Sequence, residues 1–129
     1  MFEDLLDAIF SSSEKVRYVG IVDHYGRKVE GGMRSRKESM NPESEEEKMY
    51  VQAALRRGMT ETWSNYFGEA RWSMTAHKRI IVVEFPLGKR NSLLVTLEPD
   101  APIAEIAEFI SKLTEEREML EHRPQTTLT

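Results

Sequence analysis

The three histidines are the residues of this chain best suited to metal binding or proton transfer. His24 follows an aspartate in a turn-forming stretch, His77 ends a strand pattern, and His122 lies near the end of the chain, so no two have metal-ligand spacing. Asp23 could orient His24 as a general base, but an aspartate in a turn usually hydrogen-bonds nearby backbone instead. We therefore predict no metal site and no catalytic residue.

The sequence also lacks the motifs that bind cofactors or activate nucleophiles. It contains no cysteine, which excludes thiolate ligands and cysteine nucleophiles. Gly31-Gly32 lacks the lysine and the following helix of a phosphate-binding loop, and no serine lies in a nucleophile-elbow motif. The glutamates between residues 43 and 47 fit the start of a helix, where the dipole favours negative charge. We predict a protein that has no cofactor and is not an enzyme.

Basic and aromatic residues offer a third kind of chemistry, the binding of single-stranded nucleic acid. Such residues alternate between positions 56 and 90, namely Arg56, Arg57, Trp63, Tyr66, Arg71, Trp72, Lys78, Arg79, Lys89 and Arg90. The net charge of the chain is −4, and the aromatic positions fit a protein core better than an exposed stacking platform. We do not expect nucleic acid as a partner.

The stretch from Val16 to Arg34 predicts a β-hairpin around which the rest of the chain is organised. Apolar residues fill both faces of its first strand, which is typical of a strand covered on both sides. Asp23 and Gly26 supply the turn. The second strand is polar and contains two glycines, as an edge strand does. An amphipathic helix over residues 2–10 precedes the hairpin.

After a polar loop at residues 35–42, the pattern predicts one uninterrupted helix from Ser44 to Phe67, which Gly68 ends. We expect one apolar arc of this helix to lie on the sheet, formed by Val51, Leu55, Met59, Thr62, Trp63, Tyr66 and Phe67. A second strip carries small residues and should face away from the sheet, formed by Tyr50, Ala53, Ala54, Arg57 and Gly58. This strip fits either contact with another helix or an ordinary solvent-exposed face.

Three further strands and one helix complete the predicted domain. The strands cover residues 70–76, 80–85 and 93–97, and the helix follows Pro102. We expect a single domain over residues 1–117 and a flexible tail over residues 118–129.

The sequence gives no sign of export or of membrane insertion. No apolar run reaches the ~20 residues that cross a bilayer, and the first residues are acidic, unlike a secretory signal. Together with the lack of cysteine, this favours a cytoplasmic location.

The order helix, strand, strand, helix, three strands, helix predicts an α+β domain with a five-stranded antiparallel sheet. With the apolar run, aspartate, turn and glycine of residues 19–26, this order resembles the Roadblock (dynein light-chain) family, which has a profilin-like fold. A PAS-like domain is the alternative. Residues 17–23 and 52–57 also resemble small single-domain proteins of ammonia-oxidising archaea, a likeness that implies no activity.

The Roadblock resemblance implies a homodimer built from the second helix and the neighbouring strand, which serves as a platform for small-GTPase or motor partners. We therefore predict a dimeric interaction or scaffold module that regulates a partner protein. The candidate interface residues come from the second helix and the edge strand: Tyr50, Ala53, Ala54, Arg57, Arg27, Val29 and Met33.

The alternative function is a PAS-like sensor with a small-molecule pocket between the sheet and the long helix. Such pockets are mostly apolar, although methionines and aromatics at this spacing also fit a plain core. The candidate pocket residues are Met59, Trp63, Phe67, Trp72 and Met74.

Overall fold

The computed structural model describes residues 1–34 and 43–121. Its elements are α1 (Glu3–Ser12), β1 (Val16–Val22), β2 (Lys28–Met33), α2 (Glu43–Glu61), α3 (Ser64–Phe67), β3 (Ser73–Ala76), β4 (Ile81–Leu87), β5 (Asn91–Leu97) and α4 (Ile103–Glu121). The predicted loop at 35–42 and residues 122–129 of the predicted tail lie outside the described residues. Helix α4 continues past residue 117, where we expected the tail to begin.

The five strands form one antiparallel sheet in the order β2-β1-β5-β4-β3. Strand β1 pairs with β2 on one side and with β5 on the other, so the first strand of the hairpin lies inside the sheet. Strand β4 pairs with β5 and β3. The α+β class and the five-stranded antiparallel sheet that we predicted are confirmed.

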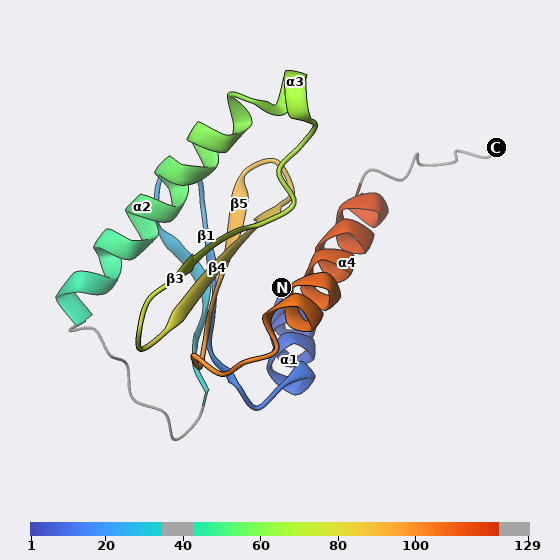
Figure 1. Ribbon diagram of the computed structural model, residues 1–129. Coiled ribbons are helices and arrows are strands. Elements are labelled where there is room, and N and C mark those ends of the chain that lie inside the picture. Colours follow the sequence, from blue (N-terminus) through green and yellow to red (C-terminus); the bar gives the residue numbers. More distant parts are fainter. Residues whose placement is uncertain (35–42, 122–129) are drawn as a thin grey trace.

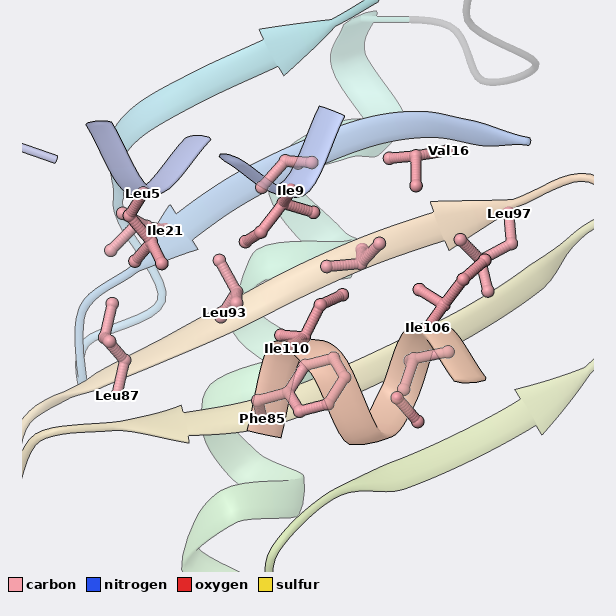
Figure 2. Packing of buried hydrophobic residues seen from close by; sticks show 14 of the residues in the cluster. Leu5, Ile9, Val16, Ile21, Phe85, Leu87, Leu93, Leu97, Ile106 and Ile110 are labelled. Atoms are coloured by element: carbon pink, nitrogen blue, oxygen red, sulfur yellow. The ribbon is translucent and has the colours of Figure 1, made fainter. Parts of the chain in front are cut away.

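The helices cover the two faces of the sheet unequally. Helices α1 and α4 lie together on one face, and α2 crosses the other face, as Figure 1 shows. The face under α1 and α4 holds the main core, in which α1 and α4 contribute Leu5, Ile9, Ile106 and Ile110 to a cluster with strand residues (Figure 2). The hydrophobic cluster under α2 is much smaller, and its buried members are Tyr18, Val22, Tyr50 and Leu94.

The β1–β2 turn has the chemistry that the sequence predicted. Oδ1 of Asp23 accepts hydrogen bonds from the backbone amides of Tyr25 and Arg27, both at 2.9 Å. Gly26 adopts a φ of 83°, which favours glycine. The amide of Arg27, the amide of Tyr25 and the nearby charges hold the pKa of the Asp23 carboxyl below its usual range. Asp23 is therefore a structural turn residue.

The uninterrupted helix predicted from Ser44 to Phe67 is wrong, because α2 ends at Glu61 and α3 begins at Ser64. At the junction, the amide of Trp63 bonds to the carbonyl of Thr60, three residues back, in place of the helical partner four residues back. The hydroxyl of Thr62 bonds to the carbonyl of Gly58. Threonine side chains that bond to helix carbonyls compete with the regular ladder, which gives a physical reason for the break.

Candidate functional site

The side of α2 that faces the sheet carries one small residue, Ala53, between the longer side chains of Tyr50 and Arg57. Ala53 is 1% exposed and Tyr50 is 6% exposed. The hydroxyl of Tyr50 lies 2.9 Å from the hydroxyl of Tyr18 on β1, and the guanidinium of Arg57 donates to the carbonyls of Gly88 in the β4–β5 turn and of Asn91 at the start of β5. These contacts fix α2 on the sheet through the polar tips of long side chains.

The face of α2 that we expected to point outward is therefore the face that lies on the sheet. This expectation is wrong for Tyr50, Ala53 and Arg57, whose side chains are buried or half-buried against the strands; Ala54 lies at the border and is half-buried. The reason is chemical: tyrosine and arginine can bury their stems when their polar tips find partners, and here every tip does.

The opposite side of α2 carries an exposed apolar surface, which continues into α3. We call it the α2 arc, and its members are 46% to 79% exposed: Val51, Leu55, Met59, Trp63, Tyr66 and Phe67. The ring of Trp63 stacks on that of Phe67 at 5.6 Å and lies 6.4 Å from that of Tyr66. We had expected this arc to lie on the sheet, and that expectation is wrong.

Strand β3 adds a second exposed feature, the β3 edge, which comprises residues Ser73–Ala76. Among the described residues, β3 pairs with β4 alone, so its other side offers free backbone groups. Met74 on this strand is exposed. The β3 edge is close to α2, since Arg56 binds Glu84 on the neighbouring strand β4 at 2.8 Å.

The candidate interface residues on the hairpin lie at the other end of the sheet. Strand β2 is the edge farthest from β3. Arg27 and Val29 are exposed there, whereas Met33 is half-buried and packs on the small cluster under α2. The structure thus buries part of the candidate interface between α2 and the sheet, and a role for Arg27 and Val29 stays a prediction.

The five candidate pocket residues are not brought together around one cavity. Met59, Trp63 and Phe67 belong to the exposed α2 arc. Trp72 packs against the core on the other face of the sheet, and Met74 lies on the exposed β3 edge. Their apolar types were consistent with a pocket, but α2 presents its opposite side to the sheet.

The residues considered for catalysis and metal binding, His24, Asp23 and His77, lie in turns and make contacts there. The ring of His24 packs on that of Tyr25 at 4.0 Å, while the carboxylate of Asp23 is engaged by the turn. The backbone amide of His77 bonds to the carbonyl of Ile80 in the β3–β4 turn. Within residues 1–34 and 43–121, no three His, Asp or Glu side chains are grouped so that they could hold a metal ion.

The basic residues are dispersed over the sheet. Arg56, Arg57 and Arg71 each bind a carboxylate, on Glu84, Glu61 and Glu108 respectively. The two lysine-arginine pairs, at 78–79 and 89–90, lie in the turns at opposite ends of β4. A strand of this length spans about 20 Å, so these pairs form no continuous basic path.

The described part of the chain contains no helix with the length and hydropathy needed to cross a membrane.

The element order and sheet topology define a profilin-like fold of the Roadblock type. Solved structures with this fold include a Roadblock/LC7 domain from Streptomyces avermitilis, which is 14% identical over 91% of this chain and 95% of its own, with a TM-score of 0.68. A structure of MglB with a tetrameric arrangement is 15% identical over 88% of both chains, with a TM-score of 0.65. Profilin IA of Acanthamoeba castellanii is 9% identical over 94% of this chain and 99% of its own, with a TM-score of 0.65.

These likenesses confirm the fold that the sequence suggested. No protein-family model matches the chain, and a search of curated proteins found no match. At identities this low, the shared fold does not transfer a function.

Proposed function

We propose that this chain is a non-enzymatic interaction module that forms a homodimer through the α2 arc and the β3 edge. The exposure of the α2 arc is the observation on which the proposal rests. Monomeric proteins seldom leave a continuous apolar patch of more than a few hundred Å² in water. The arc has three aromatic residues of about 150–250 Å² each, all more than half exposed, which present roughly 300–500 Å² without the aliphatic members.

The size of this surface fits a dimer contact. A stable interface buries about 800 Å² on each partner, and Val51, Leu55 and Met59 extend the aromatic patch towards that area. A two-fold axis brings the same patch of both copies together, so that one axis can pair two α2 helices and two β3 strands. The tetrameric arrangement of the MglB structure supports self-association by this fold.

The role that we propose for the dimer is to hold or regulate a protein partner in the cytoplasm. A small GTPase is the class of partner that the Roadblock resemblance implies. The dispersed and paired basic residues favour a protein partner over nucleic acid.

Sedimentation velocity at ~50 µM tests the dimer, a concentration at which an interface of standard size is formed. We expect the wild-type chain to sediment with twice its mass of 15.0 kDa. A double variant, Leu55→Glu with Met59→Glu, places two charges in the α2 arc and should sediment as a monomer. Both side chains are exposed in a single copy, so circular dichroism should show an intact fold.

Val29→Glu is the matched control, because it also places a glutamate at an exposed apolar residue, at the opposite edge of the sheet. This variant should remain dimeric. A wild-type monomer would refute the proposal. A dimer that survives the α2 variant and is lost in Val29→Glu would move the interface to β2.

A further inference from the structure

Helix α2 lies above the sheet at a distance that long side chains bridge, and this leaves a cavity beneath its N-terminal half. The cavity has a volume of about 520 Å³ and lies between α2 and strands β1, β3, β4 and β5. It is on the face of the sheet opposite α1 and α4. Small-molecule sites in proteins have volumes of about 300–1,000 Å³.

The walls of the cavity are largely apolar. Val82 and Leu94 come from the sheet, Ile80 comes from the β3–β4 turn, Met33 comes from the edge strand β2, and Met49 comes from α2. Val82 and the two methionines pack beside the small buried cluster but are only partly buried themselves. Under α1 and α4, by contrast, the alternate residues of β4 are fully buried. Among the described residues, side chains thus cover the apolar floor under α2 only in part.

The charged groups of the cavity wall are engaged by other side chains. Arg56 forms an ion pair with Glu84, and Arg17 forms one with Glu98 at 2.7 Å. Glu46 accepts a hydrogen bond from the Tyr50 hydroxyl at 3.4 Å. A charged ligand would therefore meet groups that already have partners and would lose its hydration without full compensation.

Two tyrosine hydroxyls contribute to the polar part of the wall, together with Gln52, Thr75, His77 and Thr96. Tyr18 and Tyr50 both line the cavity, and their hydroxyls bond to each other at 2.9 Å. Each hydroxyl oxygen has two lone pairs, so the pair keeps acceptor capacity after its mutual bond. A ligand group that matches this capacity is an N–H or O–H donor.

We propose that this cavity is a binding site for an uncharged, mostly apolar small molecule that carries one hydrogen-bond donor. The site is formed within a single copy by residues of the sheet and the inner side of α2. It shares no residue with the α2 arc and only Thr75 with the β3 edge, so a single copy can form it without the proposed homodimer.

N-phenyl-1-naphthylamine is a suitable probe, because it is uncharged and apolar, has a single N–H donor, and fluoresces in apolar surroundings. We expect a saturable rise in fluorescence with one probe per chain, and a higher melting temperature because the folded state binds the probe. The absence of a saturable rise would refute the proposal.

Methionine methyl NMR of the wild-type protein locates the probe. Met33 and Met49 line the cavity, whereas Met59 lies in the α2 arc and Met74 on the β3 edge. Shifts at Met33 and Met49 support the proposal. Shifts at Met59 and Met74 alone would show that the probe binds the exposed apolar surface, which overturns it.

A cavity-filling variant gives an independent readout. Gln52 lines the cavity from an exposed position on α2 and belongs to neither the α2 arc nor the β3 edge, so Gln52→Trp adds volume there without disturbing the core. We expect probe affinity to fall at least tenfold in Gln52→Trp and to be kept in the Leu55→Glu, Met59→Glu double variant. The reverse pattern would refute the cavity and would leave the dimer to be judged by sedimentation.

Discussion

The hydrogen bond between Tyr18 and Tyr50 allows a direct test of how α2 is held on the sheet. Tyr50 donates to the carboxylate of Glu46, which can only accept, so the proton between the two tyrosines must come from Tyr18. The bonds therefore run in one direction, from Tyr18 through Tyr50 to Glu46. Both rings are buried, so the cost of removing either hydroxyl depends on its place in this series of hydrogen bonds.

The two single variants should differ in free energy of unfolding. In Tyr50→Phe, the buried hydroxyl of Tyr18 loses its acceptor, which costs about 1–3 kcal/mol. In Tyr18→Phe, the hydroxyl of Tyr50 still donates to Glu46, so the loss is about 0.5–1.5 kcal/mol. The double variant leaves no orphaned hydroxyl and should be more stable than Tyr50→Phe alone, with a coupling of about 0.5–3 kcal/mol.

Urea unfolding at fixed protein concentration measures these differences through the midpoint at constant slope. Tyr25→Phe is the matched control, because Tyr25 is exposed at the hairpin turn, and it should change the free energy by less than about 0.5 kcal/mol. Equal losses in free energy of unfolding for the two single variants, or additive losses in the double variant, would refute the direction given to these hydrogen bonds.

Two further predictions use unfolding measurements. Gly31 has a φ of 123° and a Cβ there would lie 2.2 Å from the carbonyl oxygen of Val19, so Gly31→Ala should lower the free energy of unfolding by at least about 2 kcal/mol. The matched control is Gly32→Ala, whose Cβ meets no atom within 4 Å and which should lower it by less than about 0.5 kcal/mol. Burial raises the pKa of the Tyr18 and Tyr50 hydroxyls, most strongly for Tyr18. The unfolded chain then loses these protons first, so stability should fall as pH rises through about 10, by up to about 1.4 kcal/mol per pH unit for Tyr18 and by less for Tyr50. Parallel pH profiles for the wild type and the double tyrosine variant would contradict this.

The fold was predictable because its signals are local and repeated. Strand β1 has apolar residues on both faces, and the aspartate-to-glycine turn follows at once, so a hairpin with one inner and one edge strand was the consistent solution. The period of the chain then changes from helix to strand in the order that the structure has.

The orientation of α2 was not predictable from hydrophobicity. Its larger apolar residues, Leu55 and Met59, face away from its own sheet, while Tyr50 and Arg57 face inward. An apolar arc predicts that something covers it, without saying whether the cover is the same chain. The polar tips of Tyr50 and Arg57 have partners on β1 and the β4–β5 turn, contacts distant in sequence that no local pattern reveals.

The cavity depends on the same orientation. Helix α2 presents Ala53 between Tyr50 and Arg57 to the sheet, and the space beside them is set by how far these long side chains hold the helix away. The spacing of two packed layers follows from tertiary packing and is not encoded in periodicity. The break before α3 was missed for a related reason, because an apolar arc continues across it from Met59 to Tyr66.

The character of strand β2 has a consequence for assembly size. A sheet with two open margins can polymerise without limit, copy after copy, unless one margin resists pairing. Strand β2 carries the charged Lys28 and Glu30, an irregular register opposite Ile21 and Val22, and the left-handed Gly31, which are devices that natural proteins use against fibre growth. Association through β3 should therefore terminate at a closed pair, and sedimentation should reveal no higher polymers.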